Sequence, residues 1–363
     1  MAPQKEPCLD IAHQRLYNQQ IAGATFKAPG EVVGWLGAVQ AQDYLGSLWA
    51  VGLRVRGATE ASIEQAIADR TIVRTWPMRG TLHFVAAADA RWMPELLTPR
   101  VISRSAGRYR QLELDDATFA RSKELFIEAL EGGRQLSRPA MYQVLEAAGI
   151  SAAGQRGIHI FGRLAQEGLL CFGTREGKQP TFVLLDEWVP NARSMERDEA
   201  LAELTRRYFT GHGPATVQDL MWWSGLTATE VKAGLEMVKT ELVKETIDGQ
   251  TYYKSPTAPA AIDNAPSLYL LAPFDEYLLG YKDRSAVLRA EDVQRVNPGS
   301  NGVFSPIIVV DGRVVGTWKR AFKKGGVLVT PLPFATLNDA ELEAFVVAAS
   351  RYGDFLGMPV ILS

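Results

Sequence analysis

Cysteine is nearly absent from this sequence of 363 residues, which contains only Cys8 and Cys171. The two are far apart, and neither has a His or Cys neighbour at the spacing of metal ligands. This excludes a disulfide framework and a zinc site as organising features, and it fits a reducing cytoplasm. The four histidines do not cluster as metal ligands either. We therefore predict no metal site.

Long apolar runs and an excess of positive charge are also missing. No uninterrupted apolar stretch approaches the roughly 18 residues that a membrane span needs, and residues 1–8 lack the apolar core of a signal peptide. The net charge is −2 and the pI is near 6.2, whereas non-specific nucleic-acid binders usually carry a basic excess. We expect a cytoplasmic protein without a membrane partner, on which any nucleic-acid site is a local basic surface.

What remains is the composition of an ordinary globular protein, 47% hydrophobic and 22% charged, with no low-complexity tract. The length allows two or three domains at roughly 100–200 residues each. A Gly-rich phosphate loop, a Walker-type lysine and a Gly-x-Ser-x-Gly elbow are all missing. Their absence argues against the nucleotide-binding and serine-hydrolase classes that these motifs identify.

Two glutamines flank a single alanine in the run Val39-Gln40-Ala41-Gln42-Asp43. The run closes a segment that starts at Pro29 and has apolar residues at helical spacing. On a regular helix, residues i and i+2 point about 200° apart, so Gln40 and Gln42 share a face only on extended backbone. We predict that the helix breaks near residues 38–41 and aims both amides the same way. The alternative is a helix end at which these side chains cap carbonyl groups.

Helices followed by a two-stranded hairpin are predicted three times along the chain. In the first copy, residues 49–55 alternate like a strand, a helix covers 62–68, and runs 71–76 and 81–85 flank a turn. The second copy has helices at 117–131, 141–147 and 157–166 and strands at 168–172 and 181–185. The third has helices from residue 200 to beyond a capping box at 227–230, then a hairpin around Asp248-Gly249. This pattern predicts an α+β chain with tandem winged helix-turn-helix units at residues 9–110, 111–190 and 198–258.

The C-terminal part of the chain has a different pattern. Residues 303–310, 313–318 and 326–330 alternate like antiparallel strands, with Asp311-Gly312 as a tight turn, and 338–351 has the pattern of a last helix. We predict a β-rich, barrel-like element at residues 265–363.

Four motifs occur in an order that resembles a known family. They are Gln40-Ala41-Gln42, the run from Arg74 to His83 (RTWPMRGTLH), Ala272-Pro273-Phe274-Asp275, and Gly316-Thr317-Trp318-Lys319-Arg320. With them the chain resembles the bacterial AlkZ- and YcaQ-like winged-helix DNA glycosylases, in the branch that carries Gln-x-Gln. The resemblance implies tandem winged helices around a concave DNA-binding surface. It also implies hydrolysis of the N-glycosidic bond of alkylated bases, including crosslinked ones.

The chemistry of two amides restricts the substrate. A neutral amide has no useful basicity near pH 7, so Gln40 and Gln42 can orient water and contact the sugar or phosphate but cannot take a proton. A purine alkylated at N7 or N3 is already cationic, and its departure needs only a placed water and a stabilised oxocarbenium-like transition state. We predict a monofunctional, monomeric glycosylase without cofactor, acting on double-stranded DNA at the nucleoid. Asp43 is a further catalytic candidate, for water activation or support of the cation; the alternative is a helix cap.

Basic residues gather in three places that we predict to contact DNA. Arg100, Arg104 and Arg108 are spaced by four, so a phosphate backbone would relieve their repulsion on a helix; a solvated loop is the alternative. The predicted first wing and the C-terminal hairpin supply the other predicted contacts, basic ones together with Thr317 and Trp318: Arg74, Arg79, His83, Thr317, Trp318, Lys319, Arg320, Lys323 and Lys324. Surface charge, or for His83 a buried position, is the alternative there.

Three other features have simpler interpretations. Asp275 and Glu276 form a possible acid/base pair, but the resemblance implies a structural role at an interface. Trp222 and Trp223 are predicted to pack in the core. A non-catalytic winged-helix regulator is the main alternative function. It is disfavoured because the predicted recognition helix of the third unit mixes Glu and Lys instead of presenting basic residues.

Overall fold

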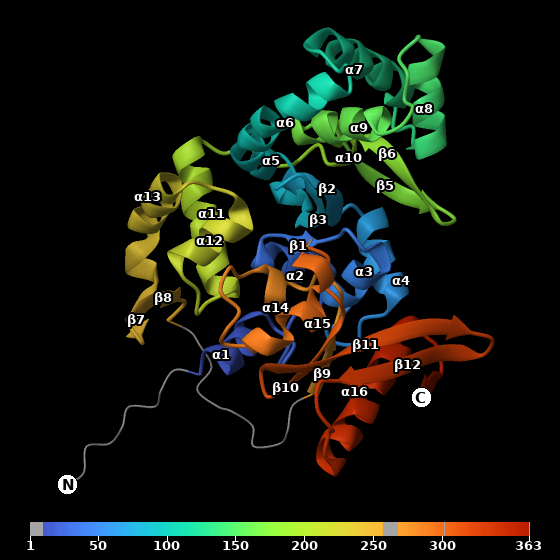
Figure 1. Cartoon of the computed structure of the whole chain (residues 1–363). Coiled ribbons are helices and arrows are strands. Elements are labelled where there is room, and N and C mark those ends of the chain that lie inside the picture. The colour runs from blue at the N-terminus through green and yellow to red at the C-terminus, as the bar shows by residue number, and fades with distance from the viewer. Residues whose placement is uncertain (1–9, 257–267, 301, 363) are drawn as a thin grey trace.

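The structure of the chain is a computed structural model that describes residues 10–256, 268–300 and 302–362 (Figure 1). The expected unit boundaries at residues 9, 258 and 265 lie outside these ranges. Strands of the described residues form one sheet of six strands, one of five and one of two. No helix in these ranges is long and apolar enough to cross a membrane.

The six-stranded sheet joins the hairpins of the first two segments. Its order is β1-β3-β2-β5-β6-β4, and β2 pairs with β5 through Arg74 and Phe172. The strands are β1 (Val39–Gln40), β2 (Ile72–Met78), β3 (Thr81–Ala86), β4 (Leu136–Ser137), β5 (Leu170–Glu176) and β6 (Gln179–Leu184). The first two expected units thus share one continuous sheet.

One helix of the first segment, α3 (Tyr44–Gly52), contacts β1 and corrects a prediction. The other helices that precede β2 are α1 (Ile11–Asn18), α2 (Pro29–Leu36) and α4 (Glu60–Ala68). Residues 49–52, predicted as part of a strand, belong to helix α3. The prediction was wrong because every residue from Gly46 to Gly52 is buried. A helix without a polar face lacks the 3.6-residue pattern by which helices are identified.

The second and third segments contain the helices and hairpins predicted for them. The first segment also contains α5 (Trp92–Leu97) and α6 (Pro99–Gln111), and the second contains α7 (Asp116–Leu130), α8 (Arg138–Ala147), α9 (Arg156–Gln166) and α10 (Leu185–Trp188). The third consists of α11 (Arg197–Gly211), α12 (Val217–Ser224), α13 (Ala228–Val238), β7 (Val243–Ile247) and β8 (Gln250–Lys254). The predicted capping box is present, because Thr227 and Glu230 exchange hydrogen bonds at the start of α13.

The C-terminal sheet is open. Its order, β13-β12-β11-β10-β9, has a different strand at each edge, so the described residues do not close the predicted barrel. Helix α16 packs against β9 at one edge. The elements are β9 (Leu268–Leu271), α14 (Glu276–Leu279), α15 (Val293–Val296), β10 (Ile307–Val310), β11 (Arg313–Lys323), β12 (Gly326–Pro333), α16 (Asp339–Leu356) and β13 (Val360–Leu362).

The first segment and the C-terminal sheet share one hydrophobic core, so the blue and orange-red elements lie together in Figure 1. Trp49 of α3 packs its ring 5.0 Å from that of Tyr352 and donates from Nε1 to the carbonyl oxygen of Leu270 at 2.7 Å. A second core joins the third segment to the first, with Trp223 and Met93 among its members. The segment containing Gln40 therefore lies between two separate packing partners.

Candidate functional site

The Gln motif begins where helix α2 ends. Gly37 has φ of 78°, and a Cβ there would come within 3.3 Å of the Trp223 ring. The following residues are extended: Val39 and Gln40 form β1 and pair with Phe84 and His83 of β3. The predicted helix break is therefore confirmed. Gln40 is buried, with 8% of its surface exposed, whereas Gln42 is exposed.

Protein donors orient both amide groups. Nη2 of Arg79 donates to Oε1 of Gln40 at 3.0 Å, and the backbone N–H of Leu82 donates to Oε1 of Gln42 at 3.2 Å. Guanidinium and backbone N–H groups only donate, so the amide oxygens must face them and the NH₂ groups face away. Each amide oxygen keeps a second lone pair. The pair therefore presents donors to a substrate and can still accept a hydrogen bond from water.

Arg74 holds the residue between the two glutamines. Its Nε and Nη2 donate to the carbonyl oxygen of Ala41 at 3.1 and 2.8 Å, and its guanidinium lies 4.8 Å from the centre of the Phe172 ring. Burial lowers the pKa of Arg74 to about 10. With only 9% of its surface exposed, Arg74 supports the motif and offers little to DNA, which corrects the predicted contact.

His83 is also a supporting residue. It is fully buried, its Nε2 lies 3.2 Å from Nη2 of Arg79, and its Nδ1 lies 3.0 Å from the carbonyl oxygen of Thr81. Because the guanidinium must donate, Nε2 accepts and Nδ1 carries the proton. Burial and the Arg79 charge lower the pKa of His83 to about 3, so the ring is neutral. No part of it is exposed to contact DNA, contrary to the prediction.

Arg79 occupies the turn of the first hairpin, where it and Gly80 have φ values of 53° and 76°. Besides Gln40, it contacts the carbonyl oxygen of Trp223. Burial lowers the pKa of Arg79. The half-buried guanidinium thus links the Gln motif, the first hairpin and helix α12.

Asp275 and Glu276 are both buried and make different contacts, as expected of structural residues. Asp275 forms a buried ion pair with Arg54, with Nη1 and Nη2 at 2.9 and 2.7 Å from the carboxylate oxygens. Oε1 of Glu276 instead accepts the backbone N–H of Gln40 at 3.1 Å. Sequence reasoning missed the second contact because 236 positions separate its partners. Within the described ranges, no three His, Cys, Asp or Glu side chains are placed to hold a metal ion.

Asp43 caps the start of α3. Its Oδ1 accepts the backbone N–H of Gly46 at 2.7 Å, so the capping role considered from the sequence is present. The carboxylate is 40% exposed and lies 3.7 Å from the guanidinium of Arg320 on β11. The catalytic role of Asp43 stays a prediction. The contact with Arg320 places one basic residue of the C-terminal hairpin beside the Gln motif.

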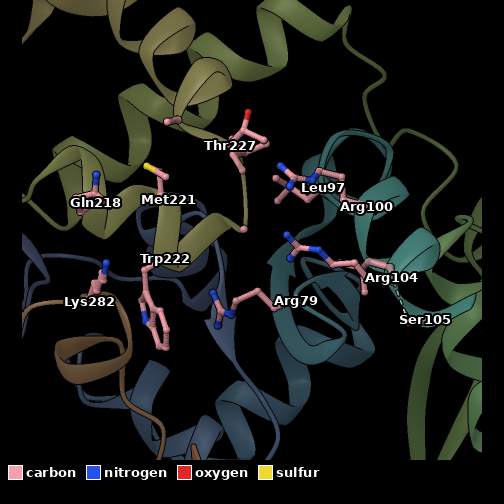
Figure 2. A pocket seen from close by; sticks show the side chains of 14 residues that line it. Arg79, Leu97, Arg100, Arg104, Ser105, Gln218, Met221, Trp222, Thr227 and Lys282 are labelled. Atoms are coloured by element: carbon pink, nitrogen blue, oxygen red, sulfur yellow. Dashed lines mark hydrogen bonds between the residues drawn. The ribbon is translucent and has the colours of Figure 1, made fainter. Parts of the chain in front are cut away.

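A cleft of about 780 Å³ lies between α6 and α12–α13, and Arg79 connects it to Gln40. Figure 2 shows Arg100 and Arg104 on one side of this cleft and Trp222 and Lys282 on the other. The cleft is lined by Arg79, Leu97, Arg100, Val101, Arg104, Ser105, Gln218, Met221, Trp222, Gly225, Leu226, Thr227, Ala228 and Lys282.

The cations of this cleft differ in their partners. Arg100 lies 3.6 Å from Glu230, whereas the exposed side chains of Arg104 and Lys282 have no hydrogen-bond or ion-pair partner in the described part of the chain. Trp222 is 47% exposed here, which corrects its predicted core position, while Trp223 is fully buried as predicted. The sequence did not identify Lys282 and Trp222 as cleft residues. The predictions started from clusters of basic residues, and neither residue lies in one of those clusters.

The other predicted DNA contacts fall into two groups: Arg108 and Trp318 bond within the protein, whereas the remaining ones are accessible on the C-terminal hairpin. Arg108 lies on α6, which is a helix as assumed, but it donates to Gln155 at 2.6 Å and does not line the cleft. Trp318 is 2% exposed, and its Nε1 donates to the carbonyl oxygen of Leu271 at 2.8 Å; it packs in the core, so this predicted contact was wrong. The predicted contacts on the β11–β12 hairpin that are exposed or half-buried are Thr317, Lys319, Arg320, Lys323 and Lys324.

Comparisons with known proteins point to one family. The family model described as DNA glycosylase AlkZ-like matches residues 33–355. An interstrand DNA cross-link repair glycosylase of Streptomyces sahachiroi is 28% identical over 338 residues, covering 88% of this chain and 89% of the relative. The solved structure of Streptomyces sahachiroi DNA glycosylase AlkZ is similar with a TM-score of 0.79 and 25% identity, covering 98% of each chain.

Proposed function

Since the chain belongs to the AlkZ-like DNA glycosylases, we propose that it hydrolyses the N-glycosidic bond of cationic alkylated purines, N7-alkylguanine and N3-alkyladenine. We propose further that it is monofunctional, acts as a monomer on double-stranded DNA and also unhooks interstrand crosslinks. The observation that carries the proposal is that protein donors fix the amide oxygens of Gln40 and Gln42. Gln40 lies in the short strand β1, and Gln42 follows it.

The orientation of the amides matches the needs of a cationic substrate. The leaving purine already carries the charge that an acid would otherwise supply, so the enzyme must place a water and stabilise positive charge on the sugar. The second lone pair of each amide oxygen can receive the water, and the outward NH₂ groups can bind sugar or phosphate oxygens. Asp43, 40% exposed, adds a negative charge near the developing cation. Neutral lesions such as uracil gain nothing from this arrangement.

The surrounding cations can hold the DNA. We infer that the three helix-and-hairpin segments are tandem winged-helix units. The order of elements supports this, because each hairpin directly follows its helices. The residues that we propose to contact phosphates line the cleft or lie exposed or half-buried on the β11–β12 hairpin: Arg79, Arg100, Arg104, Lys282, Lys319, Arg320, Lys323 and Lys324.

Crosslinked substrates require access without base flipping, because a base tied to the other strand cannot swing out freely. Gln42 is exposed, and the neighbouring cleft is open to solvent along residues such as Arg104 and Trp222. The similar Streptomyces sahachiroi protein is described as an interstrand cross-link repair glycosylase. Both points favour unhooking as a second activity.

The test is excision by the full chain in enzyme excess. Duplexes that contain N7-methylguanine or uracil are incubated with the protein, and abasic sites are then cleaved by alkali. We expect strand scission at N7-methylguanine and none at uracil. If the N7-methylguanine duplex is bound but never cleaved, the protein is a non-catalytic DNA-binding protein instead.

A further inference from the structure

The backbone of Gln40 is held by a buried carboxylate on the side away from its sheet. Ala41 donates its N–H to the carbonyl oxygen of Leu82 at 2.7 Å, so this N–H points toward β3. Successive N–H groups of a strand point in opposite directions, so the N–H of Gln40 points away from β3. There it meets Oε1 of Glu276 at 3.1 Å. Glu276 therefore supplies the acceptor that a further strand would otherwise provide.

The same carboxylate is tied to the third segment. Its Oε2 accepts Nε1–H of Trp223 at 2.8 Å and lies 3.5 Å from Nε2 of His212. Glu276 and His212 are both fully buried. One carboxylate thus connects the Gln motif, helix α12 and the residue that follows α11.

Glu276 is ionised in this setting. Burial raises the pKa of its carboxyl, but His212 and Arg79 act against burial and leave the pKa below its ordinary value. The negative charge of Glu276 also acts on Arg79. Burial lowers the pKa of Arg79, whereas the Glu276 carboxylate stabilises the protonated guanidinium. Arg79 in turn donates to Oε1 of Gln40. Gln40 is therefore held at its backbone by the anion and at its side chain by the cation.

We propose that Glu276 is a positioning residue for the glycosylase reaction, which fixes the backbone and amide of Gln40 in the orientation that catalysis uses. The inference rests on the function proposed above for the Gln pair. It differs from a general packing role because Glu276 contacts the Gln motif directly. The adjacent Asp275 is equally buried but contacts Arg54 and the start of α14.

This pair of neighbours provides a matched experiment on the full chain. In Glu276→Gln, the amide keeps its size but can offer its oxygen to only one of the two N–H donors, and its own NH₂ opposes the other. In Asp275→Asn, a buried ion pair is weakened without touching Gln40. For each variant, single-turnover excision of N7-methylguanine, the DNA Kd, thermal unfolding and hydrogen exchange of the Gln40 amide are measured.

We expect Glu276→Gln to slow single-turnover excision by at least about tenfold while the DNA Kd changes by less than about twofold. The Gln40 amide should exchange faster, because its hydrogen bond is lost or weakened. Asp275→Asn should lower the unfolding temperature yet leave excision by the folded protein and exchange at Gln40 close to wild type. Adding Trp223→Phe to Glu276→Gln removes one competing donor, so exchange at Gln40 should slow again and excision should partly recover.

The proposal is overturned if Glu276→Gln excises as fast as wild type with unchanged exchange at Gln40, or if Asp275→Asn reproduces both effects. Failure of the proposed function is a separate result. In that case wild-type protein does not excise N7-methylguanine, whereas hydrogen exchange still reports whether Glu276 holds Gln40.

Discussion

Gln40 and Gln42 differ in how much of each is buried, yet both have an amide oxygen fixed by a protein donor. We expect Gln40→Ala and Gln42→Ala each to slow single-turnover excision of N7-methylguanine on the order of 100-fold, the loss typical of one fixed hydrogen-bonding group in a transition state. Binding of DNA should change little, because the cations around the cleft are untouched.

The control for these variants is Gln65→Ala, which removes an exposed glutamine on α4 whose side chain, among the described residues, bonds to Asp69 alone. It should excise at the wild-type rate. Excision at the wild-type rate by both motif variants would remove the Gln pair from the mechanism.

His83 makes folding stability depend on pH. Its pKa is about 3 in the folded chain against an ordinary value of 6.5. Between these values the unfolded chain binds a proton that the folded chain refuses, so stability falls as the pH drops below about 6.5. The contribution is about 1.4 kcal/mol for each pH unit. Urea unfolding of wild type and His83→Gln from pH 7 to 4.5 should therefore converge toward low pH. Parallel pH dependences for the two proteins would show that His83 accepts a proton in the folded state.

At the scale of elements, the cleft between α6 and α12–α13 predicts the salt dependence of DNA binding. The side chains of Arg104 and Lys282 have no hydrogen-bond or ion-pair partner in the described ranges, so each can release a counterion by meeting a phosphate. Arg104→Ala and Lys282→Ala should each reduce the slope of log Kd against log salt by about 1. Arg121, paired with Glu124 on α7, is the control; an equal change in Arg121→Ala would mean that the effect is general charge and not the cleft.

The β11–β12 hairpin separates a core residue from its basic neighbours. Trp318 points into the core, so Trp318→Ala should destabilise the chain by about 3–5 kcal/mol, measured by urea unfolding. Lys323 is exposed near the tip, so Lys323→Ala should weaken DNA binding with little effect on stability. A stable Trp318→Ala protein with weakened DNA binding would restore the contact predicted from the sequence.

Elements fixed by local chemistry were predictable from the sequence. The capping box at Thr227, the turn at Asp248-Gly249 and the break after α2 each depend on a few adjacent residues. Helix α3 was not, because burial on all sides hides its periodicity. Nor was the contact between Gln40 and Glu276, since no local pattern relates residues 236 positions apart. The motif was visible in the sequence, whereas most of the groups that hold it were not.

At the scale of the whole molecule, the first segment and the start of helix α14 in the C-terminal part are joined by a buried charge pair. Arg54 and Asp275 are each 1% exposed at the side chain and lie 2.7 Å apart. Arg54→Met should destabilise the chain by about 3–5 kcal/mol, because it leaves Asp275 buried without its partner. Lys239→Met, which removes an exposed pair with Glu236, should change urea unfolding by less than about 1 kcal/mol. Equal midpoints for both variants would mean that Asp275 finds another donor.

The six-stranded sheet ends in a strand of two residues on each side, β1 and β4. Exposed edge strands are the usual templates on which another chain can extend a sheet. Here β1 is too short for such pairing, and Glu276 already occupies the outward N–H of Gln40. The contact that orients the Gln motif thus also closes one route to aggregation, so a change at position 276 should be examined for self-association as well as for lost activity.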